Sequence, residues 1–481
     1  MPDKQFYKTL IHNIGYSFFS TALMSILIFV GNVLVARFLG PGEFGTFFTI
    51  SAMVMLLGVV FTGDSANTKI VSESEVGQKG YTAALKVIAL YQIIFGLLAI
   101  GLIAGLRRYF PPEISIYTTS ITIITVSYLT SIMFSTYWIG SHKLNWEIFA
   151  SVVPVLLQSV VLAVLLPIGF GLSKVLYYWA WSWALYCWIF LPIVFLCFAR
   201  RYNVRGMTIT SSWFSFPHKY YLVYGFYLKA SKVIQTSIPL IFSFYLIYLL
   251  KGTNEIGMYG SATKIVGVIS VVMGAFLKVL LPSFSRLFAQ GNTAMLQSLS
   301  ITFFKYINIM AFFIASVLLI FNDVIIRTVY GEVYSAAMPI FIILSAAAYF
   351  EGLKAISSSL LNATQYAFNV TVIEFVKWLF IVVSAYIAIR HYGAIGGSVI
   401  LLLGSMFAVL SQLFLVKKLI KIDTLSLFFT IIIMLLAFIL VSFPITKLYG
   451  ILALLITFFY IVGSIKPSEV KYVFAVLLKL T

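Results

Sequence analysis

Long apolar runs separated by short polar segments make up the whole chain. Each run has about 20 residues, which is the length that a helix needs to cross a hydrocarbon layer about 30 Å thick. We therefore expect an all-α, polytopic membrane protein with about fourteen transmembrane helices. The predicted spans are 14–36, 45–66, 82–104, 115–137, 147–168, 175–198, 221–249, 257–281, 301–321, 335–360, 368–389, 394–415, 424–443 and 448–464.

The composition supports this fold class and excludes several functions. Hydrophobic residues make up 62% of the chain and charged residues 10%, whereas soluble domains carry about 25% charged residues. The sequence has no GxxxxGK[ST] loop, no HExxH and no paired CxxC, so no motif for ATP hydrolysis or metal binding is present. Because no predicted loop is long enough for a catalytic domain, we expect a transporter that is not an enzyme and has no cofactor or metal.

The basic residues indicate orientation rather than a nucleic-acid partner. The net charge is +18, but the lysines and arginines lie in short segments between the apolar runs and do not gather on one surface. With both termini in the cytoplasm, most of these residues face inward, as the positive-inside rule requires. A minority face outward, and Arg107 and Arg108 form the outward loop that fits this orientation least well. We expect membrane lipid as a partner and no nucleic acid.

A short repeat predicts two lobes. Glu43-Phe44-Gly45-Thr46-Phe47 opens the second predicted span and resembles Glu255-Ile256-Gly257-Met258-Tyr259, which opens the eighth. Six intervening spans keep both copies in one orientation, so the lobes would be related by an axis along the membrane normal. The predicted divisions are a six-helix lobe at 1–198, a cytoplasmic connector at 199–220, a second six-helix lobe at 221–415, and two further helices with a cytoplasmic tail at 416–481.

Prolines inside the spans predict kinks, at Pro154, Pro239 and Pro339. A membrane helix accepts proline when neighbouring groups satisfy the backbone carbonyl that the missing N–H leaves free.

Ionisable residues inside the spans are the candidate functional residues, because a charge at a helix centre costs at least about 2.5–3.5 kcal/mol. The lysines exceed the acids, and nearly all of these residues fall in the second half of the chain. A basic site would attract an anionic head group such as a pyrophosphate, whereas a site for organic cations would be acidic. The substrate-binding candidates are Lys264, Lys377, Lys354, Lys229 and Lys232.

The intramembrane acids have two interpretations. Glu351 with Lys354, and Glu374 with Lys377, are spaced i,i+3, which predicts two local ion pairs that make the helices insertable. Asp64 has no such neighbour in the sequence. All three acids are candidates for binding a coupling ion, and a structural role is the alternative.

Four segments resemble a known family. Residues 35–45 (VARFLGPGEFG) resemble the ARxLGPxxFG segment of polysaccharide-biosynthesis flippases. Residues 330–337 (YGEVYSAA), 361–364 (LNAT) and 392–397 (YGAIGG) add further matches in the same order along the chain. Together they resemble the Wzx-type branch of the MATE-like (MOP) exporter superfamily.

The resemblance implies a function. Such flippases move undecaprenyl-pyrophosphate-linked oligosaccharide, for O-antigen or another surface polysaccharide, across the bacterial cytoplasmic (inner) membrane. They use alternating access and an ion gradient, with proton or sodium as the candidate coupling ion and a polysaccharide polymerase and a chain-length protein as candidate partners. The resemblance assigns no binding role to Lys264 or Lys377. The alternatives are a cation-coupled multidrug exporter, a flippase for a peptidoglycan or teichoic-acid precursor, and a membrane glycan polymerase, which would need a large outward catalytic loop.

Overall fold

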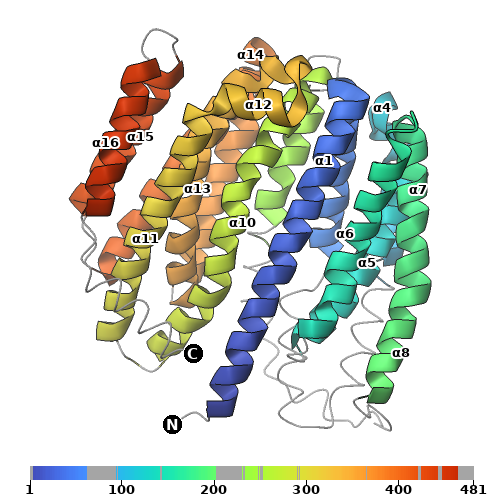
Figure 1. Ribbon diagram of the computed structural model, residues 1–481, viewed down its shortest axis with the longest axis horizontal. Helices are drawn as coiled ribbons and strands as arrows, with labels where there is room; N and C mark the ends of the chain where they lie inside the picture. Colours follow the sequence, from blue (N-terminus) through green and yellow to red (C-terminus); the bar gives the residue numbers. More distant parts are fainter. Residues whose placement is uncertain are drawn as a thin grey trace. The chain divides into compact units, whose positions relative to one another are not determined.

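The computed structural model is helical throughout the part of the chain that it describes, with no strand there (Figure 1). This confirms the all-α fold class. The described residues are 4–61, 94, 96–140, 144–201, 230, 233–246, 249, 253–289, 291, 293–364, 366–420, 424–442 and 447–463.

Where the structure describes the chain, the helices fall on the predicted spans, with ends that differ by up to about ten residues. The longer helices are α1 (Lys4–Phe61), α5 (Thr118–Gly140), α6 (Leu144–Leu165), α7 (Leu172–Leu185), α8 (Leu191–Arg201), α10 (Asn254–Ala289), α11 (Thr293–Ile320), α13 (Met338–Ala363), α14 (Ala367–Leu419), α15 (Thr424–Ser442) and α16 (Lys447–Gly463). A π-helical turn, Tyr186–Phe190, joins α7 to α8, and the short elements are η1 (Arg107–Tyr109), α4 (Pro112–Ser115), α12 (Asn322–Tyr330) and η4 (Glu332–Ala337).

Two glycines reverse the direction of the two longest helices. Gly40 in α1 has φ 74° and Gly393 in α14 has φ 59°, a backbone region that only glycine adopts without strain. Beyond Gly393 the chain returns alongside itself, because a Cβ on Gly404 would lie 2.9 Å from Ile381 Cδ1. Each long helix therefore contains two of the predicted spans.

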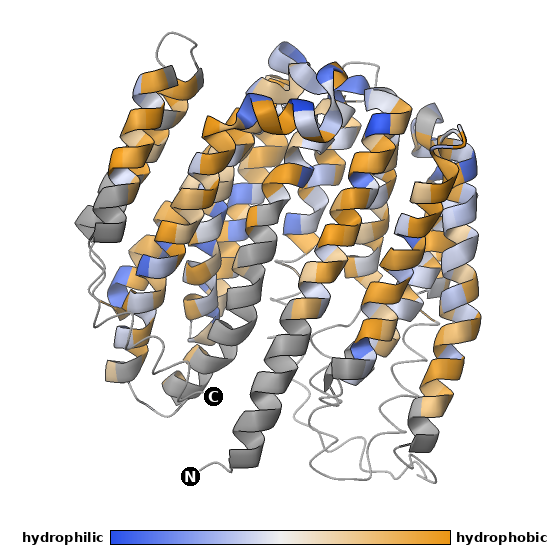
Figure 2. Ribbon diagram, in the orientation of Figure 1, coloured by the Kyte–Doolittle hydropathy of each residue, from blue (hydrophilic) through white to orange (hydrophobic). Residues whose placement is uncertain are grey.

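The described helices are those of a multi-pass membrane protein. Seven of them are long and apolar enough to cross a membrane, and α1 and α14 are among these seven. Large apolar side chains remain exposed along them, such as Phe414 and Ile456. Figure 2 shows hydrophobic colour over most of the helical ribbon. Lipid is the natural solvent for such surfaces.

The chain forms two compact units. One extends from His12 to Tyr248, and the other contains Leu249–Thr481 together with Met1–Ile11. All but the first three residues of the predicted connector, 199–220, lie outside the described residues. The division into lobes at that connector therefore stays a prediction.

Pro154 shows how the membrane helix accommodates proline. Its missing N–H would otherwise bond to the carbonyl of Ala150, and the Ser131 hydroxyl of α5 donates to that carbonyl instead. The carbonyl of Pro154 in turn accepts the indole N–H of Trp183 at 2.5 Å. Pro339 differs from the expectation, because it lies in the first turn of α13. Proline removes no helical hydrogen bond there, so it marks a helix start rather than a kink.

The two copies of the repeat make equivalent contacts. Glu43 Oε2 accepts the backbone N–H of Leu172, the first residue of α7, at 3.2 Å. Glu255 Oε2 accepts the N–H of Ala394, the first residue after the reversal in α14, at 3.1 Å. In both units a glutamate that opens one span therefore satisfies a free N–H at the start of another. This equivalence supports the repeat predicted from five residues.

We expect Glu255→Ala to lower the stability of its unit. Loss of a side chain that caps a helix N-terminus typically costs about 1 kcal/mol, so the midpoint of thermal unfolding in detergent should fall. Glu255→Gln should lower the midpoint less, because its amide oxygen can still accept the hydrogen bond. Glu332→Ala is the matched control, because Glu332 pairs with Arg327 at an exposed site and such pairs contribute little. Equal midpoints for Glu255→Ala and the unchanged protein would contradict this role.

Candidate functional site

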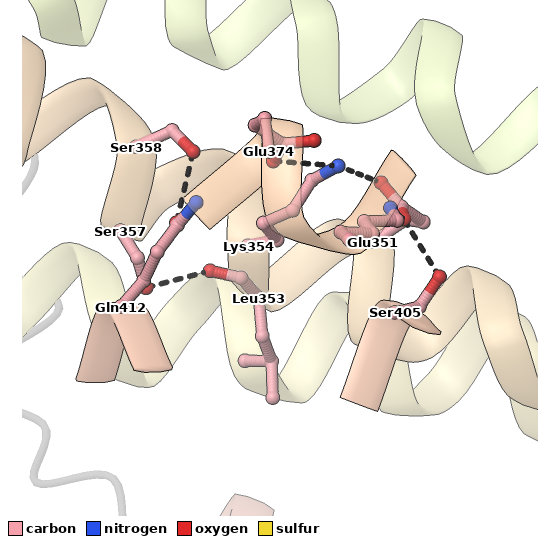
Figure 3. Close-up of polar contacts among 9 residues, drawn as sticks. Glu351, Leu353, Lys354, Ser357, Ser358, Glu374, Ser405 and Gln412 are labelled. Atoms are coloured by element: carbon pink, nitrogen blue, oxygen red, sulfur yellow. Dashed lines mark hydrogen bonds and ion pairs between the residues drawn. The ribbon is translucent and has the colours of Figure 1, made fainter. Parts of the chain in front are cut away.

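Four charged side chains meet between α13 and the first half of α14, and we refer to them as the charge cluster: Glu351, Lys354, Glu374 and Lys377. Lys354 Nζ lies 2.5 Å from Glu351 Oε2 and 3.3 Å from Glu374 Oε1. Lys377 Nζ lies 2.5 Å from Glu351 Oε1. Figure 3 shows the Lys354 ammonium group between the two carboxylates. Every member of the cluster therefore has a partner of opposite charge.

The charge cluster lies deep in the membrane-spanning part of its unit. Glu351 is near the middle of α13, about 20 Å from the first residue at 1.5 Å per residue. Glu374, Lys377 and Lys354 are 1%, 3% and 6% exposed. Charges at such a position persist only when they are paired. Because two lysines face two glutamates, the cluster has no net charge and contributes nothing to the basic excess predicted from the sequence.

Glu351 differs from the other members because it is both central and open. Its side chain is 34% exposed, whereas the side chains of its partners are almost entirely covered. Each carboxylate oxygen takes one lysine, and the Ser405 hydroxyl donates a further hydrogen bond to Oε1 at 2.7 Å. Glu351 is therefore the point at which the charge cluster is accessible, and an entering anion would meet the two lysines there.

One of the two predicted ion pairs is correct and the other is wrong. Glu351 pairs with Lys354 as the i,i+3 spacing predicts. Glu374 pairs with Lys354, and Lys377 pairs with Glu351, instead of Glu374 with Lys377. The reason is that α13 and α14 pack side by side, so that Glu351 lies between the two ammonium groups. Spacing along one helix contains no information about such contacts across helices.

A glycine allows the close packing that builds the cluster. A Cβ on Gly404 would lie 3.5 Å from Lys377 Cγ in addition to its contact with Ile381. The second half of α14 therefore packs against the aliphatic part of the Lys377 side chain, which places the Ser405 hydroxyl within hydrogen-bond distance of Glu351.

Sequence reasoning missed two uncharged members of the site, Ser405 and Gln412. Gln412 is fully buried, and its Oε1 accepts the Ser358 hydroxyl at 2.9 Å (Figure 3). Its Nε2 has no hydrogen-bond partner in the structure, and neither has Glu374 Oε1 beyond its ion pair. Ser405 and Gln412 are two helical turns apart and share a face. Their position on one face of an otherwise apolar span is the feature of the sequence that could have identified them.

The other candidates are not part of the charge cluster. Lys264 is half-buried on α10. Met273, nine residues further along α10, is the residue near Gly352 on α13, so Lys264 lies about 13 Å along the helix from the level of the cluster. Lys229, Lys232 and Asp64 lie outside the described residues.

The described residues contain no group of three or more histidine, cysteine, aspartate or glutamate side chains that could hold a metal ion. What the charge cluster offers chemically is two ammonium groups and two carboxylates in a poorly hydrated setting.

Among known proteins, the matches to this chain are solved structures rather than related sequences. No protein-family model matches the sequence, and no curated protein does. An inward-facing multidrug resistance MATE family transporter of the MOP superfamily matches with a TM-score of 0.63 at 13% identity, over 82% of this chain and 94% of the other. The lipid II flippase MurJ in an inward closed conformation matches with a TM-score of 0.59 at 17% identity, over 94% and 98%.

A third match is a MOP superfamily transporter from Pyrococcus furiosus, described as having a binding pocket of reverse polarity. Its TM-score is 0.57 at 15% identity, over 86% and 96% of the two chains. The MurJ match covers 94% of this chain. The remaining residues are fewer than those in 416–481, so the match includes part of that C-terminal segment. The chain therefore has the fold that the MATE transporters of the MOP superfamily share with MurJ.

Proposed function

We propose that this protein is a Wzx-type flippase that moves undecaprenyl-pyrophosphate-linked oligosaccharide from the cytoplasmic to the outer leaflet of a bacterial inner membrane. The observation that carries the proposal is the charge cluster, in which two buried lysines can be reached at Glu351. The fold and the four sequence segments that resemble polysaccharide flippases support the same function.

The geometry of Glu351 suggests how a pyrophosphate binds. Its two oxygens each hold one ammonium group, of Lys354 and of Lys377. A phosphate group presents anionic oxygens in a similar arrangement and can take the place of the carboxylate. The exchange keeps both lysines paired, and a proton taken up by the displaced Glu351 carboxylate avoids an uncompensated buried negative charge. Attraction between the ions is also stronger here than at a hydrated surface.

The same exchange provides a route for ion coupling. A proton on Glu351 removes its charge and leaves both lysines to the substrate. When the pyrophosphate departs, Glu351 loses the proton and pairs with the lysines again. Substrate binding and protonation of Glu351 therefore favour each other.

Two alternatives receive less support. A cation-coupled multidrug exporter could use the carboxylates of Glu351 and Glu374, but Glu374 is 1% exposed and the accessible Glu351 already holds two ammonium groups. A flippase for a peptidoglycan or teichoic-acid precursor would meet the same pyrophosphate chemistry, and MurJ is named as a lipid II flippase. The sequence segments, rather than the charge cluster, favour a surface polysaccharide.

Reconstitution of the full chain in proteoliposomes tests the transport function. Undecaprenyl-pyrophosphate-linked oligosaccharide placed in one leaflet should become accessible to a sugar-modifying enzyme on the other side. Protein-free vesicles are the control. Export of an organic cation with no movement of the lipid-linked sugar would assign the protein to the multidrug class and reject this proposal.

A further inference from the structure

The two halves of α14 enclose a groove at the end of the helix pair that the loop charges place in the cytoplasm. Its volume is about 420 Å³. Its lining residues run from Phe368 to Ile373 near the start of α14 and from Ser411 to Leu415 near its end, a length of about 8 Å along the helix. The side chains that line it include Phe368, Asn369, Val372, Ser411, Phe414 and Leu415.

The lining of the groove is apolar, but two polar groups interrupt it. Phe368, Val372 and Phe414 are 54%, 42% and 66% exposed, so their faces are available to lipid. Asn369 is exposed near the helix end and Ser411 is half-buried further in. An amide and a hydroxyl in an apolar groove need hydrogen-bond partners, and the ester carbonyls of a phospholipid can accept hydrogen bonds from both.

Positive charge lies at the mouth of the groove. Lys418 Nζ is 5.1 Å from the centroid of the Phe414 ring, which lines the groove. Lys417 is the adjacent residue in the last turn of α14, and both lysines are exposed. Two lysines at the level of the head groups favour an acidic lipid over a zwitterionic one.

We propose that this groove binds one acidic phospholipid. Its acyl chain lies along Phe368, Val372 and Phe414, and its ester carbonyls accept hydrogen bonds from Asn369 and Ser411. Its phosphate pairs with Lys418 and Lys417. The site is separate from the charge cluster and does not depend on the transported substrate.

Occupancy of the groove has a consequence for the charge cluster. Ile373, which also lines the groove, precedes Glu374, and Ser411 precedes Gln412. Lipid on the outer face of these turns holds together the two halves of α14 that carry Lys377 and Ser405. The phospholipid is therefore also a structural support for the cluster.

Native mass spectrometry of the full chain in detergent tests the site, with phosphatidylglycerol and phosphatidylcholine as probes. The unchanged protein should retain one phosphatidylglycerol in preference to phosphatidylcholine. In a Lys417→Gln/Lys418→Gln double variant the affinity for phosphatidylglycerol should fall about 25-fold, because each lysine contributes about fivefold. Lys174→Gln is the matched control, since Lys174 Nζ also lies over an aromatic ring, 4.8 Å from the Phe170 centroid, in the other unit.

A second variant separates the groove from charge attraction alone. Val372→Trp fills the groove and leaves both lysines in place, so it should displace the lipid without a change of charge. Full phosphatidylglycerol binding by Val372→Trp would show that the lysines hold lipid at the surface and would overturn the groove site. Equal affinity for the two lipids, or an equal loss in Lys174→Gln, would overturn it as well.

Discussion

Lys377→Ala is expected to lower the rate of lipid-linked glycan export by at least about 100-fold. The lysine is 3% exposed and its Nζ lies 2.5 Å from Glu351. Truncation removes one of the two ammonium groups that would hold a pyrophosphate. Loss of one partner from a buried charge pair with a ligand costs roughly 3 kcal/mol of binding, and each 1.4 kcal/mol is about tenfold. Lys377→Arg keeps the charge and should retain part of the export, measured as surface polysaccharide per amount of protein in the membrane.

Membrane abundance and a control variant separate this effect from misfolding. Arg327→Ala removes a charge from an exposed cluster with Asp323 and Glu332 and should export normally. A Lys264→Ala/Lys377→Ala double variant that is abundant in the membrane and exports at the normal rate would show that the head group is held elsewhere and that these lysines are structural.

Glu351→Gln is expected to raise the affinity for undecaprenyl pyrophosphate about tenfold or more, while export slows. Removal of the competing carboxylate charge next to both lysines is worth at least about 1.4 kcal/mol at the effective dielectric of a protein. Glutamine keeps the acceptor for Ser405 but cannot take up and release a proton. Affinity should therefore rise, and release of the substrate should slow because glutamine cannot regain the negative charge that pairs with the lysines.

Glu374→Gln is the matched control for this result. This variant makes the same Glu-to-Gln change at a carboxylate that is 1% exposed and contacts Lys354 on the buried side of the cluster. Glu374→Gln should therefore give no comparable gain in affinity. An equal gain in both variants would show that net charge, and not competition at Glu351, controls binding. Unchanged or weaker binding in Glu351→Gln would remove Glu351 from substrate recognition.

Much of the fold could be predicted because the membrane imposes a length on every apolar run. The breaks between predicted spans at 36–45 and 389–394 contain Gly40 and Gly393, where the chain reverses. The repeat was visible as Glu43 and Glu255 in a shared five-residue pattern, although only the structure shows that both carboxylates cap a helix.

The candidate site could be predicted only in part. The high cost of intramembrane charge identified Glu351, Lys354, Glu374 and Lys377 individually. Their pairing depends on which faces of α13 and α14 meet, and the periodicity of one helix does not specify its neighbour. Ser405 escaped notice because a hydroxyl costs little to bury once it donates a hydrogen bond.

The central claim is that a pyrophosphate takes the place of Glu351 between two buried lysines. The most direct measurement is the equilibrium affinity of the purified full-length protein for undecaprenyl pyrophosphate and for undecaprenyl monophosphate, each with and without Lys377→Ala. The account predicts tighter binding of the pyrophosphate by the unchanged protein and a loss of that preference in the variant. Equal affinity for the two lipids, unaffected by Lys377→Ala, would contradict it.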